Sequence, residues 1–199
     1  MKLILENISM SFGGRKIFGD ISAVIEKGEV LAITGPNGSG KTTLIRIIAS
    51  LLRPSTGRVG LLFGNTEYTG RIILQIGLVS PDLYLYEELT ANENLRFFAN
   101  MSGIDVSDFD ADLDRFGLKG RGSDLVKSYS SGMKQRLKYI LALLRKPPLL
   151  LLDEPMANLD PEGKKVVEEI IKGHDGITVI ATNEESELAY GDRTIRLGS

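Results

Sequence analysis

Residues 35–42 have the composition of a phosphate-binding loop. They read Gly-Pro-Asn-Gly-Ser-Gly-Lys-Thr and match the pattern Gly-x-x-x-x-Gly-Lys-Ser/Thr. The glycines let backbone N–H groups turn inward toward phosphate oxygens, and the start of a following helix adds partial positive charge. Lys41 should reach the β- and γ-phosphates of a nucleotide, and the Thr42 hydroxyl suits Mg²⁺. The predicted phosphate-binding residues are Gly35, Pro36, Asn37, Gly38, Ser39, Gly40, Lys41, Thr42 and Thr43.

The alternative for this segment is a glycine-rich turn with an exposed lysine. The apolar residues 30–34 before the loop and the helical spacing of apolar residues after it favour phosphate binding, because the pattern requires a strand and a helix on its two sides.

Two acids, Asp153 and Glu154, directly follow the apolar run 149–152. Such a run is typical of a strand covered on both faces in a parallel sheet, and ligands of open α/β sheets bind at the carboxyl edge. Asp153 could hold Mg²⁺ through water, and Glu154 could accept a proton from a water that attacks the γ-phosphate. By itself an Asp-Glu-Pro triplet is more often a solvated acidic turn, so this prediction depends on the phosphate loop upstream.

The elements that position these residues alternate between strands and helices. Thr90 and Glu93 form a capping box that starts a helix near residue 91, and Asp160 is suited to cap another that begins with proline. Further helices are expected over 42–52, 131–145 and 184–190. Extended segments are expected over 2–9, 21–26, 30–34, 57–63, 72–79, 149–152, 177–182 and 193–197.

This order predicts an α/β fold of the P-loop NTPase class. Its features are a mainly parallel sheet, an N-terminal antiparallel β subdomain and an inserted helical subdomain. We expect one domain over 1–199, in which 1–79 and 147–199 form the catalytic core and about 80–146 form the helical subdomain.

The composition excludes several classes of protein. With 24 Lys and Arg against 26 Asp and Glu, the net charge of -2 argues against a strongly basic nucleic-acid binder. The absence of cysteine excludes disulfides, zinc–thiolate sites and a cysteine nucleophile. The apolar runs are shorter than the roughly 18 residues of a membrane-spanning helix, and no secretory signal is recognised, so we expect a cytoplasmic protein. The single histidine, His174, is expected in a surface loop.

Residues 129–136 read Tyr-Ser-Ser-Gly-Met-Lys-Gln-Arg and resemble the signature motif, usually Leu-Ser-Gly-Gly-Gln, of the nucleotide-binding subunits of ABC transporters. At the start of a helix, Ser130, Ser131 and Gly132 offer hydroxyl and N–H groups to an anion, although an ordinary helix cap has the same composition. In that family the motif covers the γ-phosphate held by a second subunit. The resemblance therefore implies a head-to-tail dimer, of two copies or of this chain and a homologous ATPase subunit, that encloses two ATP molecules.

Two more segments resemble motifs of this family. Residues 157–160 resemble the D-loop, in which Asp160 contacts the partner subunit while capping its own helix. Phe12 stands where the family has an aromatic residue that stacks on adenine, although an aromatic residue in a turn is otherwise explained by packing.

Two positions depart from the family pattern. Pro81 aligns with a glutamine that touches Mg²⁺ and the attacking water, and its side chain has no donor or acceptor. Ser80 or Asp82 could substitute through a bridging water. Asn183 replaces the switch histidine that bonds the γ-phosphate, and asparagine can donate a hydrogen bond but carries no charge. Segment 76–98 and Asn183 resemble the haem-exporter ATPases of cytochrome c maturation.

The resemblance implies an ATPase that uses ATP and Mg²⁺ to power a membrane transporter. Lys41, Glu154 and Asn183 would be catalytic, and Thr42 and Asp153 would hold the metal. The permease would be a separate transmembrane subunit, and residues 83–86 would suit a groove for one of its helices, or else core packing. The chain would then lie on the inner face of the cell membrane. No nucleic-acid partner is expected.

Two other functions remain open. One is a nucleotide-gated dimerising module with little hydrolysis, because the glutamine and histidine are missing. The other is a soluble ABC ATPase acting on nucleic acid or ribosomes, although such proteins often carry paired domains or long insertions. A P-loop kinase would not explain residues 129–133.

Overall fold

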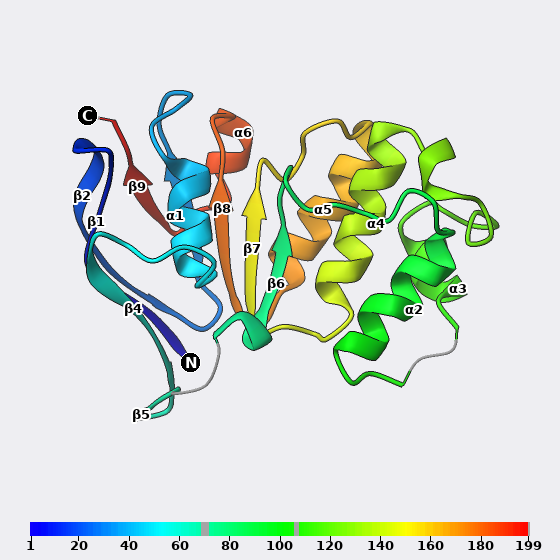
Figure 1. Cartoon of the computed structure of the whole chain (residues 1–199), viewed down its shortest axis with the longest axis horizontal. Helices are drawn as coiled ribbons and strands as arrows, with labels where there is room; N and C mark the ends of the chain where they lie inside the picture. The colour runs from blue at the N-terminus through cyan, green and yellow to red at the C-terminus, as the bar shows by residue number, and fades with distance from the viewer. Residues whose placement is uncertain (69–71, 106–107, 199) are drawn as a thin grey trace.

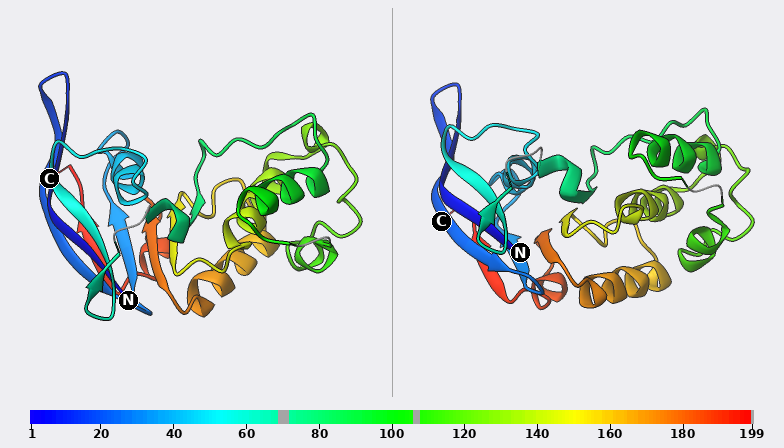
Figure 2. Two further views of the ribbon diagram at one scale, coloured as in Figure 1. Left: turned by 60° about the horizontal axis from the view of Figure 1, so that its bottom comes forward. Right: turned by 90° about the horizontal axis from the view of Figure 1, so that it is seen from below.

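An antiparallel sheet, a parallel sheet and a group of helices follow one another across the molecule (Figure 1). The computed structural model describes residues 1–68, 72–105 and 108–198. Both termini lie on the side of the antiparallel sheet. The helices α2 (Ala91–Met101), α3 (Asp110–Arg115) and α4 (Ser131–Leu143) lie at the opposite end (Figures 1 and 2). The predicted α/β fold, with an antiparallel part at the N-terminus, is confirmed.

The antiparallel sheet has the strand order β2-β1-β4-β5. Its strands are β1 (Lys2–Phe12), β2 (Arg15–Glu26), β4 (Thr56–Phe63) and β5 (Thr66–Glu67). The first two strands are longer than the predicted segments 2–9 and 21–26. Irregularities beside Asn7 and Asp20, which both have positive φ, let the pairing continue through residues that look like turns in the sequence.

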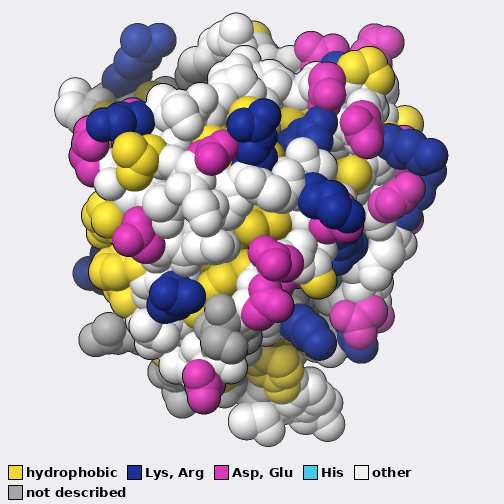
Figure 3. All heavy atoms as spheres, turned by 90° about the vertical axis from the view of Figure 1, so that its right-hand side faces the viewer, with side chains coloured by type: hydrophobic (Ala, Val, Ile, Leu, Met, Phe, Trp, Pro, Cys, Tyr) yellow, Lys and Arg dark blue, Asp and Glu magenta, His cyan; other side chains and the backbone are white. Residues whose placement is uncertain are grey.

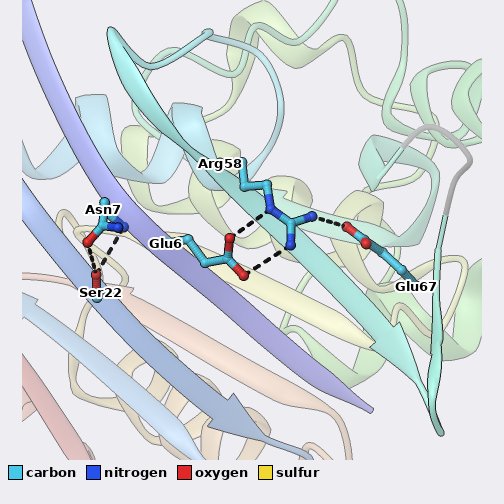
Figure 4. Close-up of polar contacts among 5 residues, drawn as sticks. All are labelled: Glu6, Asn7, Ser22, Arg58 and Glu67. Carbon is cyan, nitrogen blue, oxygen red and sulfur yellow. Dashed lines mark hydrogen bonds and ion pairs between the residues drawn. The ribbon is translucent and has the colours of Figure 1, made fainter.

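Polar side chains join neighbouring strands of this sheet on its solvent-exposed face (Figure 4). Arg58 of β4 donates from Nε to Glu6 of β1 at 2.7 Å and from Nη1 to Glu67 of β5 at 2.7 Å. The Ser22 hydroxyl of β2 donates to Oδ1 of Asn7 at 3.0 Å. Exposed pairs contribute little to stability, so their main effect is to favour one register between the strands.

The parallel sheet has the strand order β6-β7-β8-β3-β9. Every residue of β7 and β8 is buried, as the apolar run before the two acids predicts. Because all five strands are parallel, their carboxyl ends meet at one edge. The strands are β3 (Val30–Thr34), β6 (Ile76–Val79), β7 (Leu149–Asp153), β8 (Ile177–Ala181) and β9 (Arg193–Arg196).

Two apolar cores cover the two faces of this sheet. One face, with Leu149 and Leu151, packs against α1 (Lys41–Ile48) and the antiparallel sheet. The other face, with Leu150 and Leu152, packs against helices of the opposite side. Those helices include α2 (Ala91–Met101), α3 (Asp110–Arg115), α4 (Ser131–Leu143) and α5 (Pro161–Gly173). Alternating residues of β7 thus connect the two cores.

The helix caps predicted from the sequence are confirmed. The Thr90 hydroxyl accepts from the Glu93 amide at 3.2 Å, and the Glu93 carboxylate accepts from the Thr90 amide at 2.8 Å.

The helix after the phosphate loop ends at Ile48 rather than near residue 52, because Ser50 has a φ of 58°. Residues Ile72–Gln75 form a 3-10 helix rather than a strand, and α6 spans only Glu185–Leu188.

His174 lies in the loop between α5 and β8, as predicted, but its ring is not simply exposed. Its Nδ1 lies 2.9 Å from the Thr178 hydroxyl and its Nε2 lies 2.8 Å from the Pro147 carbonyl oxygen. The ring is partly buried and ties the segment before β7 to β8.

Among the described residues, no helix has the length and apolar character that crossing a membrane requires.

Candidate nucleotide-binding site

The loop between β3 and α1 is shaped by glycines that no other residue could replace without strain. Gly35, Gly38 and Gly40 have φ values of 149°, 80° and 100°. A Cβ on Gly40 would lie 2.7 Å from the Ile17 side chain, and one on Gly35 would overlap the Leu197 carbonyl. The loop is therefore held between β2, α1 and the segment after β9.

The Lys41 side chain bends back over this loop. Its ammonium group donates to the Gly35 carbonyl at 2.8 Å and lies 3.4 Å from the Pro36 carbonyl, and the residue is buried. Gly40 caps α1 without a side chain, so no side chain occupies the first N–H groups of the helix. A fixed cation and these N–H groups converge on the same loop, which is an arrangement suited to binding an anion.

Asp153 ends β7 with its carboxylate buried. The residue is 1% exposed, and neither carboxylate oxygen has a hydrogen-bond partner among the described residues. Burial raises the pKa of this carboxyl, and the charges of Glu154 and Asp82 raise it further, while the nearby Thr42 hydroxyl and Lys41 lower it. Orphaned carboxylate oxygens beside a threonine hydroxyl fit the oxygen ligands that Mg²⁺ prefers.

Glu154 directly follows the buried strand β7. It has a φ of 52°, an uncommon left-handed conformation for a residue with a side chain, and its N–H donates to the Ala181 carbonyl at 2.9 Å. The residue is exposed, and its carboxylate makes no hydrogen bond within the described part of the chain. Adjacent acids therefore end up in opposite environments, which suits two separate roles.

Asn183 lies against the phosphate loop. Its side-chain amide donates to Oδ1 of Asn37 at 2.7 Å. Because β8 and β3 are neighbours in the parallel sheet, the loop after β8 and the loop after β3 emerge side by side. The structure thus brings Asn183 to the residues that the sequence predicts to bind phosphate.

Pro81 and its neighbours are fixed by two cations from different helices. Lys138 of α4 donates to the carbonyls of Ser80 and Pro81, each at 3.1 Å, and burial lowers the pKa of its ammonium group. Arg46 of α1 forms an ion pair with Asp82. No motif in the sequence points to Arg46 or Lys138, because their roles follow from helix packing and not from spacing.

The serine-rich segment begins α4. Ser130 is the helix cap and accepts from the Met133 amide at 3.2 Å, while Ser131 lies in the first turn. A Cβ on Gly132 would lie 2.9 Å from the Asn158 carbonyl, so this turn packs closely on the 157–160 segment of its own chain. No hydrogen bond of the described residues joins 130–132 to the phosphate loop of the same chain.

Asp160 has the predicted cap role. Its carboxylate accepts from the Gly163 amide at 3.0 Å at the start of α5, and it forms an ion pair with Arg136 of α4. Both contacts lower the pKa of Asp160, the Arg136 contact more. Arg136 also donates to the Phe116 carbonyl at 3.1 Å, so it joins α4, α3 and α5.

A family model described as ABC transporter matches residues 18–157. The chain belongs to the ABC transporter family. The lantibiotic transport ATP-binding protein SrtF of Streptococcus pyogenes is 34% identical over 183 residues, which are 91% of this chain and 79% of that protein. The linearmycin resistance ATP-binding protein LnrL of Bacillus subtilis (strain 168) is 35% identical over 191 residues, which are 92% of this chain and 61% of that protein.

Solved structures agree with this membership. A solved structure of the ATP-binding subunit of an ABC transporter superposes on this chain with a TM-score of 0.86 at 27% identity. The match covers 99% of this chain and 86% of that chain. The dimeric structure of MJ0796, a bacterial ABC transporter cassette, has the same fold, with a TM-score of 0.82 at 24% identity over 98% of this chain and 94% of that chain. The family model and the curated relatives thus identify the chain as an ATPase that binds ATP and powers a transporter.

Phe12 takes no part in the polar contacts described above, and a groove lies next to Glu154. Phe12 lies at the tip of the β1–β2 hairpin and is 50% exposed, so its ring is free to stack. A groove of about 520 Å³ lies between the loop after β6, the start of α4 and Glu154, and Leu83, Leu85 and Ala157 contribute to its walls. Tyr84 is 86% exposed beside it.

Proposed function

We propose that this ABC ATPase hydrolyses ATP at a site completed by a second ATPase subunit, either another copy or a homologue, arranged head to tail. The loop 35–43 would bind the phosphates, and Phe12 would stack on adenine. Ser130, Ser131 and Gly132 of the second subunit would cover the γ-phosphate, with Asp160 close to the contact between subunits. The exposed, capped start of α4 supports this arrangement, because no hydrogen bond of the described residues joins it to the phosphate loop of the same chain.

The proposal depends on one observation: Asp153 is buried, whereas the adjacent Glu154 is exposed. Thr42 and Asp153 would hold Mg²⁺, which supplies positive charge at the phosphates when it is bound. The exposed Glu154 carboxylate would accept the proton of a water that attacks the γ-phosphorus. As the new P–O bond forms, the bond to the β-phosphate oxygen breaks, and ADP and phosphate leave.

Lys41 and Asn183 would assist the same step. Lys41 can exchange its bonds to the Gly35 and Pro36 carbonyls for bonds to phosphate oxygens, because its ammonium group already lies over the loop. Asn183 can offer one neutral hydrogen bond to the γ-phosphate from its position beside Asn37. These contacts neutralise or orient charge that develops during transfer.

The transporter's permease would dock beside residues 83–86. Tyr84 and Tyr86 are exposed there, and the Tyr86 ring packs edge-on against Phe97 at 5.0 Å. An aromatic and apolar surface next to a groove suits a helix from another subunit. In this proposal residues 1–79 and 147–199 form the catalytic core, about 80–146 form the helical subdomain, and the permease holds the chain on the inner face of the membrane.

No nucleic-acid partner is part of this proposal. On the face shown in Figure 3, Lys and Arg side chains are interspersed with Asp and Glu rather than gathered into a basic patch. The similarity of segment 76–98 to haem-exporter ATPases stays a prediction, and the relatives named above carry names that refer to a lantibiotic and to linearmycin.

The decisive experiment compares the wild type with Glu154→Gln. The wild type should release phosphate from Mg–ATP, and the variant should bind ATP equally well while turnover falls about 10²- to 10⁴-fold, the usual contribution of a general base. Blocked hydrolysis should also accumulate an ATP-dependent dimer in size-exclusion chromatography. Unchanged turnover in the variant would contradict the assignment of Glu154. Glu185→Gln, an exposed acid on α6, is the matched control.

A second function is favoured by one observation, the presence of Pro81 and Asn183 where side chains of the family contact the reacting groups. A dimerising module that binds ATP but barely hydrolyses it would give the ATP-dependent dimer already in the wild type. Phosphate release would then be close to the background rate.

The permease can be tested by crosslinking because the chain has no cysteine. Tyr84→Cys should crosslink in native membranes to a protein with several transmembrane helices, and Val24→Cys, exposed on the antiparallel sheet, should not. Equal labelling by both variants would contradict the proposed docking site.

A further inference from the structure

Tyr139 carries a hydroxyl group into an apolar core, and neither the phosphate-binding loop nor the acid pair assigns it a role. The residue lies on α4 and is 0% exposed. Its ring stacks on Phe116 at a centroid distance of 6.3 Å, a contact that a phenylalanine ring would make equally well. The hydroxyl is therefore the part of the side chain that calls for an explanation, because a buried polar group is costly unless it has a partner.

The partner of this hydroxyl is the carbonyl group of Pro155. The Tyr139 hydroxyl donates to the Pro155 carbonyl oxygen at 2.8 Å, and the bond is buried. No backbone N–H group of the described residues donates to the same oxygen. Burial raises the pKa of Tyr139, so the hydroxyl keeps its proton and remains a donor. One side chain of α4 thus holds the residue that directly follows Glu154.

The backbone of Glu154 needs support from its surroundings. Its φ of 52° lies in the left-handed region, which residues other than glycine keep only where neighbouring contacts impose it. Its N–H donates to the Ala181 carbonyl of β8 at 2.9 Å, and its carbonyl accepts from the Ala157 amide at 3.2 Å. The bond from Tyr139 follows at the next residue. Together these contacts fix the turn that carries the Glu154 side chain.

The same helix touches this turn a second time, close to its own start. Gly132 packs so closely on the Asn158 carbonyl that an added Cβ would lie 2.9 Å from the oxygen. Gly132 and Tyr139 are almost two helical turns apart, so they lie on one face of α4. The segment after β7 crosses from the sheet to the helices on this side of the molecule (Figure 1). The turn 154–158 is therefore held by α4 at two points that are about 10 Å apart along the helix axis.

We propose that Tyr139 is a positioning residue that holds the Glu154 turn at a fixed place on α4. The inference rests on the proposed function for its catalytic consequence, because Glu154 would activate the water that attacks this chain's nucleotide. The start of the same helix, residues 130–132, would cover the nucleotide of the second subunit. Without the hydroxyl the turn keeps its apolar surroundings but loses its bond to α4. The hydrogen bond itself does not depend on the proposed function.

The test compares Tyr139→Phe with Tyr68→Phe in the full chain. Tyr139→Phe removes only the hydroxyl, and we expect kcat per folded molecule to fall about tenfold, since small displacements of reacting groups can cost up to about 10²-fold. Its Kd for Mg–ATP should stay within about twofold, because the groups that bind phosphate are untouched. Tyr68 is a partly buried tyrosine packed against the other apolar core, so Tyr68→Phe should leave both constants unchanged. The folded fraction is measured by urea unfolding.

A double-mutant cycle asks whether the hydroxyl acts through Glu154. In the Glu154→Gln background, Tyr139→Phe should change the residual single-turnover rate by less than about twofold, because the group that it positions is already gone. An equal fall in both backgrounds would overturn the inference. An unchanged kcat in Tyr139→Phe, or a fall that merely follows a loss of folded protein, would overturn it as well.

Hydrogen exchange of the nucleotide-free protein tests the contact independently of activity. Residues 156–159 should exchange about three- to tenfold faster in Tyr139→Phe, which is the range that one hydrogen bond contributes, and at the wild-type rate in Tyr68→Phe. Unchanged exchange in Tyr139→Phe would show that the bond does not hold this turn. If the wild type neither bound nor hydrolysed ATP, the proposed function would fail, while the exchange result would still decide whether Tyr139 holds the turn.

Discussion

The side-chain amide of Asn183 donates a 2.7 Å hydrogen bond to Oδ1 of Asn37 in the phosphate loop. The two residues lie after β8 and β3, which are neighbours in the parallel sheet although they are far apart in the sequence. The contact holds the segment after β8 against the loop after β3. It also places an uncharged hydrogen-bond donor beside the loop that is proposed to bind phosphate.

We expect Asn183→Ala to reduce ATP turnover by roughly three- to tenfold, because a neutral hydrogen bond contributes about 0.5–1.5 kcal/mol. Asn183→His should have more turnover than the alanine variant, since a charged donor forms a stronger bond to phosphate. Steady-state phosphate release measures both. Equal rates in the wild type and the alanine variant would show that Asn183 has no part in the reaction.

Lys41→Ala should abolish ATP binding at concentrations that saturate the wild type. The variant loses the ammonium group that lies over the loop, and charge-assisted bonds to phosphate are about twice as strong as neutral ones. Calorimetry with Mg–ATP provides the measurement. Lys165→Ala, an exposed lysine of α5, controls for the loss of a positive charge and should bind normally. Normal binding by Lys41→Ala would contradict the assignment of this loop.

Gly57→Ala should destabilise the antiparallel sheet far more than Gly64→Ala. Both glycines have positive φ, 83° and 63°, and an alanine there costs roughly 1–2 kcal/mol. At Gly57 the added Cβ would also overlap the Glu6 and Asn7 carbonyls, whereas at Gly64 it meets nothing within 4 Å. We expect a loss of about 3 kcal/mol or more for Gly57→Ala. Urea unfolding would test it, and similar losses for both variants would contradict the predicted overlap.

We expect the folded protein to lose stability in alkaline solution because Tyr129 has a raised pKa. Burial, with the charge of Asp124, raises its pKa from 10.0 to about 12. The folded protein favours the neutral form of the Tyr129 phenol. The contribution of Tyr129 to the free energy of unfolding is therefore complete below pH 10 and is lost as the pH rises toward about 12. The phenol donates to the Arg121 carbonyl at 2.8 Å, so Tyr129→Phe should cost about 1 kcal/mol near neutral pH.

Urea unfolding across the alkaline range would check the Tyr129 prediction. Tyr129→Phe should lose less stability than the wild type between pH 10 and about 12, because the linked proton is absent. Tyr84→Phe, an exposed tyrosine, is the control and should match the wild type. If the free energy of unfolding changed with pH in the same way in the wild type and in Tyr129→Phe, the ionisation of Tyr129 would not be the cause of the alkaline loss of stability.

The sequence by itself determined the phosphate loop, the two acids after a buried strand, the caps at Thr90 and Asp160, and the alternation that gives the α/β fold. These features are local, since each depends on residue types at fixed spacing along a single loop, strand or helix end. They can therefore be predicted without knowing which elements are neighbours.

Only the tertiary structure decided which residues meet across elements. The bond from Asn183 to Asn37, the Arg46–Asp82 pair, the two bonds of His174 and the burial of Glu187 all join segments that are distant in the chain. Strand order and helix packing create these contacts, and no spacing pattern encodes them. A carboxylate of α6 looks like its exposed neighbours in the sequence, and its environment follows from the fold that surrounds it.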